Sequence, residues 1–255
     1  MIMPFLWLFF SSFKTPEDIA TVPIRWLPKL WTTHGYVAIW QRANLLRVFF
    51  NSTFVATGVV FFHVLTSSLA GYSFAKFKYP GRNYLFLLIL ATMMIPYQVT
   101  IIPLYVIIAK WLKLSGTYAS LILPEIVSAF GIFLMRQNML SVPDELIDAA
   151  RIDGSSEMRT FFTIVLPQVK PALASLAILT FLWNWDSLLW PLLCINRQEM
   201  WTVPIFLANL GNQYGLIELN LVFAGTMLSV LPVLLVYLFF QRSFVESLAI
   251  SGIKG

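Results

Sequence analysis

Long apolar stretches, uncharged except for Asp186 in one of them, alternate with short charged turns along this chain. The stretches cover residues 48–75, 83–109, 114–123 with 126–135, 171–195 and 219–241. A helix needs about 20 residues to cross a hydrocarbon layer of about 30 Å. Most stretches are long enough, and the two runs on either side of Pro124 and Glu125 are predicted to join into one interrupted span. The pattern therefore predicts an all-α chain that crosses a membrane several times.

The first 13 residues are apolar but too short to cross, and they lack the positive start and small-residue cleavage site of a signal peptide. We interpret them as a truncated first helix, with an interfacial segment as the alternative. Only the loops at residues 14–47 and 136–170 are long. We therefore predict about six transmembrane helices in a single domain covering residues 1–255.

Composition supports a membrane solvent and excludes several functions. The chain is 58% hydrophobic and 11% charged, with a mean hydropathy of +0.77, whereas water-soluble domains have about 45–50% apolar residues. Its net charge of +5 comes from 17 scattered Lys and Arg, not from a basic stripe, which argues against nucleic-acid binding. Cys194 is the only cysteine, and no Cys/His cluster predicts a metal site.

Orientation follows from charge only weakly. If the loop at residues 141–167 is cytoplasmic, nine Lys and Arg lie inside and eight outside, so the positive-inside rule does not decide. The short basic turn at residues 76–82 favours this orientation.

The loop at residues 141–167 holds five of the chain's twelve acidic residues and predicts two short helices. Ser141 is the expected N-cap of a helix at residues 143–152, with Asp144 and Glu145 in its first turn. Gly154 permits a turn with positive φ. Ser155 or Ser156 then caps a second helix with an apolar stripe formed by Met158, Phe161, Phe162 and Val165. On periodicity alone, an ordinary surface loop explains this pattern as well.

The order of residues in this loop indicates more. It contains Asp148-Ala149-Ala150-Arg151-Ile152-Asp153-Gly154, followed by Phe161, Ile164 and Leu166-Pro167. This segment resembles the EAA loop of ABC-importer permeases, with Asp148 in place of the usual Glu and Ser155 in place of the usual Ala. Pro-Ala-Leu-Ala at residues 171–174 is similar to the carbohydrate-uptake branch, and the chain most resembles the second, smaller permease of a maltose-type pair.

The resemblance implies a type I ABC-importer permease fold in a prokaryotic plasma membrane. The loop and the C-terminus would be cytoplasmic, and the loop would dock on an ATPase dimer. The chain contains no Gly-Lys pair and hence no Walker motif, so ATP and Mg would bind the ATPase, and no cofactor is expected here. The other implied partners are a second permease and an extracytoplasmic solute-binding protein. The implied coupling residues are Asp148, Ala149, Ala150, Arg151, Asp153, Gly154, Leu166 and Pro167.

Polar residues within the apolar stretches are the candidates for a solute pathway, because polar groups in a bilayer usually face a bundle interior. They are Glu125, Asn184, Trp185 and Asp186, and a purely structural role explains them equally well. Rings beside amide and acid groups suit sugar hydroxyls. A sugar or oligosaccharide is the expected solute, with a glycerol-phosphate ester as the alternative.

Other functions and details stay open at this stage. An ion-gradient transporter could use Glu125 and Asp186 as ion sites. A membrane enzyme is disfavoured, since no His, Cys or paired-carboxylate constellation is present. The tail at residues 242–255 is similar to one that reaches into the ATPase dimer in related permeases, and a frayed terminus is the alternative.

Overall fold

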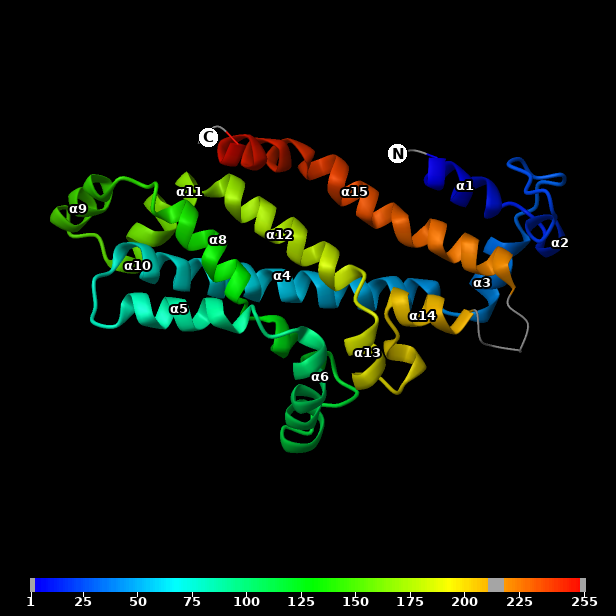
Figure 1. Ribbon diagram of the computed structural model, residues 1–255, viewed down its shortest axis with the longest axis horizontal. Helices are drawn as coiled ribbons and strands as arrows, with labels where there is room; N and C mark the ends of the chain where they lie inside the picture. The colour runs from blue at the N-terminus through cyan, green and yellow to red at the C-terminus, as the bar shows by residue number, and fades with distance from the viewer. Residues whose placement is uncertain (1–2, 211–217, 253–255) are drawn as a thin grey trace. The chain divides into compact units, whose positions relative to one another are not determined.

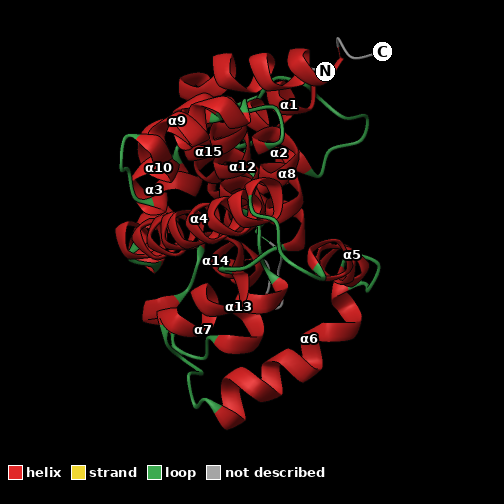
Figure 2. Cartoon of the chain, turned by 90° about the vertical axis from the view of Figure 1, so that its left-hand side faces the viewer, coloured by secondary structure: helices red, strands yellow, loops and turns green. Residues whose placement is uncertain are grey.

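The computed structural model (Figure 1) describes residues 3–210 and 218–252, with side chains as far as residue 238. Every regular element in this described part is a helix (Figure 2). The backbone forms two compact units, Met1–Phe54 with Trp185–Leu238, and Val55–Asn184 with Phe239–Gly255. Two long helices, α4 (Leu45–Lys76) and α15 (Leu219–Gly252), belong partly to each unit. The predicted cytoplasmic tail ends at residues 253–255, outside the described residues.

Two described helices are long and apolar enough to cross a membrane alone: α4, with 32 residues, and Leu219–Leu238 of α15, with 20. Both match stretches predicted from sequence. Three further pairs of helices qualify if each bent pair counts as one span, so the described residues hold two to five candidate spans. The first helix, α1 (Met3–Ser11), has nine residues and is too short, as predicted.

The stretch at residues 83–109, predicted as one span, is a bent pair of helices and not one straight helix. It divides into α5 (Arg82–Thr92) and α6 (Tyr97–Tyr105), and α6 continues as a π-helical segment, η1 (Val106–Trp111). The two parts are bent by 92°. Pro96 explains the break, because it has no amide to continue the helix and holds an extended ψ of 135° before α6.

The predicted interruption around Pro124 is confirmed. α7 (Tyr118–Ile122) and the 3₁₀ turn η2 (Leu123–Glu125) precede α8 (Ala129–Met139), and the two halves are bent by 46°. Ser128 caps α8 by accepting a hydrogen bond from the amide of Gly131 at 3.3 Å. We call residues 125–128 the break.

The stretch at residues 171–195 also differs from the prediction of one helix. α12 (Lys170–Trp185) ends after 16 residues, and α13 (Leu189–Cys194) is a separate helix in the other unit. Pro191 has no amide for the carbonyl of Ser187, which prevents a continuous helix. At its start, α12 is bent by 84° from the helical segment Glu157–Gln168.

The core of the second unit joins the acidic loop to the membrane helices. It collects buried side chains from α4, α8, α9 (Asp144–Ile152), the π-helical segment η3 (Phe161–Val165) and α12. The members are Tyr72, Ala75, Met135, Met139, Val142, Ile147, Phe161, Val165, Val169, Ala172 and Leu176. Gly71 lets α4 and α8 approach closely, because a Cβ there would lie 2.9 Å from the amide nitrogen of Arg136.

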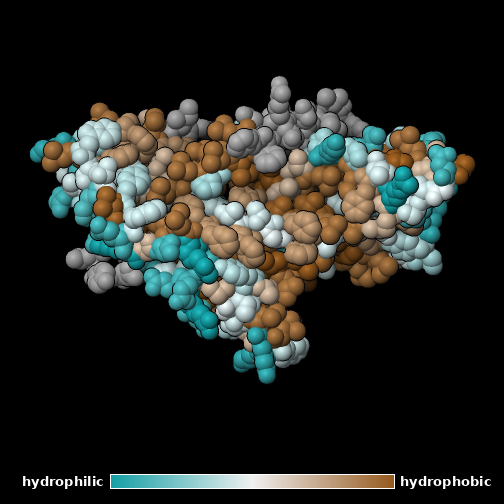
Figure 3. All heavy atoms as spheres, turned by 180° about the vertical axis from the view of Figure 1, so that it is seen from behind, coloured by the Kyte–Doolittle hydropathy of each residue, from teal (hydrophilic) through white to brown (hydrophobic). Residues whose placement is uncertain are grey.

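The first unit combines α1, α2 (Pro16–Ile19), α3 (His34–Arg42), α13, η4 (Gln198–Met200) and α14 (Val203–Leu210) with parts of α4 and α15. Aromatic rings pack along its N-terminal segment, where Phe13 contacts Trp31 and Tyr36 at centroid distances of 5.7 and 5.3 Å. Figure 3 shows one face of the chain, and hydrophobic residues cover much of that face, as expected of a surface in contact with lipid.

Candidate functional site

The first loop helix, α9, begins one residue later than predicted and is capped differently. Pro143 occupies the N-cap position with extended backbone and no side-chain cap. The predicted N-cap, Ser141, is wrong, because its hydroxyl donates instead to the carbonyl oxygen of Asn138 at 2.7 Å. Asp144 and Glu145 do lie in the first turn, where their charges complement the helix dipole.

The end of α9 confirms the expected turn at Gly154. Gly154 has a φ of +76°. The amide of Ser155 donates to the carbonyl of Ala150 at 2.9 Å, and the amide of Gly154 donates to that of Arg151 at 3.0 Å. These two bonds form a Schellman motif, in which glycine is favoured at the left-handed position. A Cβ on Gly154 would meet nothing within 4 Å, so backbone conformation alone requires glycine there.

The second loop helix follows at once. α10 (Glu157–Thr160) is capped by Ser156, whose hydroxyl accepts from the amide of Arg159 at 3.4 Å, and it leads through η3 into α11 (Leu166–Gln168). Of the predicted apolar stripe, Phe161 and Val165 are buried, whereas Met158 and Phe162 are about half exposed. The stripe is only partly buried because the π-helical turns of η3 change the angular spacing of its side chains.

The two faces of α9 have different surroundings. Ile147 and Ala150, three residues apart, are 2% and 5% exposed and anchor the helix to its own chain. The opposite face leaves Asp148, Ala149, Arg151, Ile152, Asp153 and Gly154 exposed, with Ile152 at 87%. Among the other predicted coupling residues, Leu166 is half-buried and Pro167 exposed. We call the exposed side of α9 the outer face.

A chain of polar contacts connects α9 to α10 and then to α4. Arg151 Nη1 contacts Asp148 Oδ1 at 3.1 Å, and its Nε contacts Glu157 Oε1 at 2.7 Å. Tyr72 Oη, on α4, donates to Glu157 Oε2 at 3.1 Å. The hydrogen bond to Glu157 raises the pKa of Arg151 further above its usual range. The ion pair between Arg151 and Glu157 therefore connects the residues before and after the Schellman turn.

A second contact fixes the start of α9 to the end of α4. Lys76 Nζ donates to the carbonyl oxygen of Val142 and to Asp144 Oδ1, the latter at 2.6 Å. The Lys76 side chain is only 5% exposed, and its hydrogen bond lowers the pKa of the Asp144 carboxyl. Sequence reasoning missed Tyr72, Lys76 and Glu157, because their contacts join residues 66 to 85 positions apart.

The four predicted pathway residues are divided between the two units. Glu125 is half-buried at the break, and Asn184 Nδ2 donates to the carbonyl of Thr180 within α12 at 3.0 Å. In the other unit, Trp185 is 2% exposed and its Nε1 donates to the carbonyl of Ser229 at 3.2 Å, while Asp186 is exposed. Their role in a solute pathway stays a prediction.

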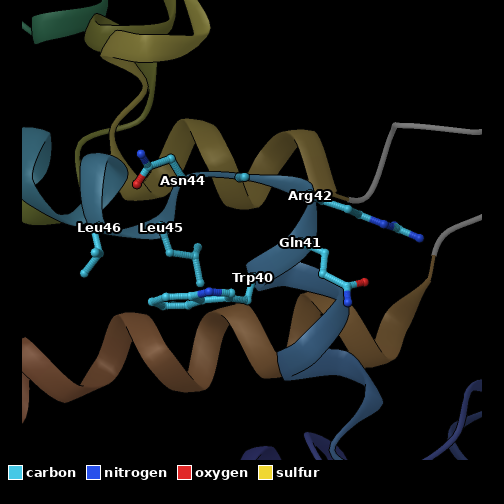
Figure 4. A pocket seen from close by; sticks show the side chains of 7 residues that line it. Trp40, Gln41, Arg42, Asn44, Leu45 and Leu46 are labelled. Atoms are coloured by element: carbon cyan, nitrogen blue, oxygen red, sulfur yellow. The ribbon is translucent and has the colours of Figure 1, made fainter.

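A pocket opens at the turn between α3 and α4 (Figure 4), at the end of α4 away from Lys76. Residues 40–46 line it, and the ring of Trp40 lies beside Leu45. Arg42 pairs with Glu218 at 3.0 Å. Within the described residues, no group of three His, Cys, Asp or Glu is placed to hold a metal ion.

Comparison with known proteins identifies the family. The pattern of the family described as "binding-protein-dependent transport system inner membrane component" matches residues 64–249. The chain belongs to this family. It is accordingly a membrane component of a transport system, not an enzyme, and the match includes the whole of α9 and the Schellman turn.

Two relatives extend the likeness to the full chain. The arabinooligosaccharides transport system permease protein AraQ of Halalkalibacterium halodurans is 37% identical over 257 residues, covering 100% of this chain and 91% of AraQ. The sn-glycerol-3-phosphate transport system permease protein UgpE of Escherichia coli O1:K1 is 33% identical over 255 residues, covering 97% of this chain and 90% of UgpE.

A solved structure shares the fold. It is the crystal structure of a bacterial ABC transporter involved in the import of the acidic polysaccharide alginate, with a TM-score of 0.84 and 20% identity. The match covers 94% of this chain and 90% of the solved one. The predicted type I importer permease fold is confirmed.

Proposed function

We propose that this chain forms half of the translocation pathway of an oligosaccharide importer, together with a second permease, an extracytoplasmic solute-binding protein and a separate ATPase dimer. The similarity to AraQ, over the full chain, supports an oligosaccharide as the solute. The similarity to UgpE favours a glycerol-phosphate ester as the second candidate.

We place the loop at residues 141–167 and the C-terminus in the cytoplasm, with the outer face of α9 in a cleft of the ATPase. The observation that carries this proposal is the division between the two faces of α9. Ile147 and Ala150 pack the helix against its own unit. On the outer face, the Ile152 residue is 87% exposed. Covering such a side chain with a partner removes apolar surface from water, which is favourable by about 25 cal/mol per Å².

Single-cysteine labelling tests the orientation. Cys194 is the only cysteine and is 1% exposed, so Cys194→Ser provides the background. Ile152→Cys is expected to react with a membrane-impermeant maleimide in inverted vesicles and to cross-link to the ATPase. The matched control, Ile24→Cys, replaces a residue that is 66% exposed in the loop at residues 14–47, which this orientation places outside the membrane. It is expected to react only in right-side-out vesicles. Labelling of Ile152→Cys from outside would overturn the orientation.

Uptake assays distinguish the solutes and the energy source. Proteoliposomes with the complete importer are expected to accumulate arabinotriose when ATP is supplied, and to do so without an ion gradient. Accumulation of glycerol 3-phosphate, with no accumulation of arabinotriose, would favour the second candidate. Uptake that persists without ATP and disappears with the gradient would contradict the ATP-driven mechanism and support a secondary transporter.

A further inference from the structure

The break and the loop at residues 141–167, which we call the coupling loop, contact the same helix, α4. The loop contacts α4 through Tyr72 and Lys76. The break contacts α4 through His63 and Thr66. Thr66 and Tyr72 are six residues apart, which corresponds to about 9 Å of helix. A helix segment this short bends little, so both contacts belong to one rigid body.

The contact between α4 and the break consists of two side chains and two successive carbonyls. His63 Nδ1 lies 2.9 Å from the carbonyl oxygen of Glu125. Because a carbonyl can only accept, this nitrogen carries the proton and donates. Thr66 Oγ1 donates to the carbonyl oxygen of the next residue, Ile126, and it also lies 3.2 Å from the carbonyl oxygen of His63 in its own helix. His63 and Thr66 are three residues apart, so they lie on the same face of α4.

These bonds satisfy groups that the break leaves open. Carbonyls at the end of a helix lack the amide that a further turn would provide. Inside a bilayer no water replaces that amide, and an unsatisfied carbonyl costs several kcal/mol. His63 is 3% exposed, so its bond to Glu125 is shielded from solvent. The break is thus held to α4 by the groups that stabilise it.

The fit between the two segments is close. A Cβ on Gly131, one turn into α8, would lie 2.8 Å from His63 Nε2 and 2.2 Å from Ser67 Oγ. Ser67 is fully buried. The helix after the break therefore contacts the same face of α4 that donates to the break, and a side chain cannot enter between them without displacement.

We propose that His63 and Thr66 are positioning residues that make the break move with α4, so that displacement of the coupling loop reaches the Glu125 segment of the solute pathway. This inference rests on the proposed importer function and names the contact through which the coupling site acts on the pathway. Neither residue belongs to the outer face of α9.

The test compares transport with ATP hydrolysis in the complete importer, reconstituted with its binding protein and arabinotriose. Thr66→Val keeps the β-branched shape and removes the donor. It is expected to lower the solute transported per ATP by about tenfold, since it leaves a buried carbonyl unpaired, while hydrolysis stimulated by the loaded binding protein is retained. Thr66→Ser restores the donor and is expected to restore coupling. Ser68→Ala is the matched control, because this buried hydroxyl on α4 donates within its own helix, to the carbonyl of Val64 at 2.6 Å.

A second measurement applies even if Thr66→Val fails to assemble. A Cβ on Gly58 of α4 would lie 3.7 Å from Ile122 Cγ1, just before the break. A disulfide between Gly58→Cys and Ile122→Cys in the Cys194→Ser background is expected to leave uptake intact, because the two segments move together. Loss of uptake on cross-linking, with recovery on reduction, would overturn the proposal, as would normal coupling in Thr66→Val. If the wild-type complex shows no ATP-driven uptake, the proposed function itself fails, independently of these variants.

Discussion

Gly71→Ala tests the close approach of α4 and α8 on which the coupling loop depends. The added Cβ would lie 2.7 Å from the Cβ of Met135, 2.9 Å from the amide nitrogen of Arg136 and 3.0 Å from the carbonyl carbon of Met135. Two of these atoms belong to the backbone of α8, so no rotamer change relieves the contact. The two helices must separate.

The size of the effect follows from these distances. Ordinary contact begins at 3.4 Å, so α8 must move by up to about 0.7 Å at its closest point, and overpacking of this kind costs about 1–3 kcal/mol. The gain in helix propensity from Gly to Ala returns at most about 1 kcal/mol. We expect a net destabilisation of up to about 2 kcal/mol. We also expect lower uptake, because Met135 and its neighbour Tyr72 belong to the core that packs against the loop.

Thermal unfolding of the purified complex in detergent measures this loss, and Gly58→Ala supplies the control. Gly58 lies on the same helix, but its Cβ would meet only the flexible end of the Ile122 side chain at 3.0 Å. The control is expected to unfold at or above the wild-type temperature. If both variants unfold at the same temperature, the backbone contact at Gly71 does not destabilise the protein, and the reasoning is refuted.

Three further predictions concern the loop. Gly154→Val forces a branched residue to positive φ at a cost of about 1–2 kcal/mol, and is expected to abolish uptake and ATPase stimulation while membrane insertion is retained; wild-type activities would contradict it. Tyr72→Phe removes the hydrogen bond to Glu157 and is expected to lower the unfolding free energy by about 1 kcal/mol, with no change counting against the contact. The pKa of Asp144 is lowered by Lys76, so the ion pair stabilises the fold above the carboxyl's ordinary pKa of 3.8 and this contribution is lost as pH falls through the lowered value. Asp144→Asn should therefore be less stable than wild type at pH 7, and the difference should disappear in acid; a difference that persists in acid would exclude the ion pair as its source.

The membrane helices were predictable where local composition decides them. α4 and the Leu219–Leu238 segment match uncharged stretches to within a few residues, and Pro124 marked the interrupted span correctly. Hydropathy shows which residues are apolar but not where a helix changes direction. The 92° bend after Thr92 was therefore missed, although Pro96 is visible in the sequence. The end of α12 at Trp185 was missed for the same reason.

Local chemistry likewise predicted part of the loop. The positive φ of Gly154 and the cap at Ser156 depend on residues within a few positions, and both are confirmed. The cap at Ser141 failed because Pro143 starts the helix later. The contacts of Tyr72 and Lys76 join distant segments, so only the folded chain could show them.

The outer face of α9 has a consequence for partner choice. It presents one alanine, one glycine and two aspartates, together with Ile152 and with Arg151, whose charge is already paired with Asp148 and Glu157. Such a surface admits a close approach of backbones but offers few side chains for a partner to discriminate. An ATPase that accepts this surface would recognise the shape of a turn more than its composition, and such recognition does not restrict one ATPase to one permease.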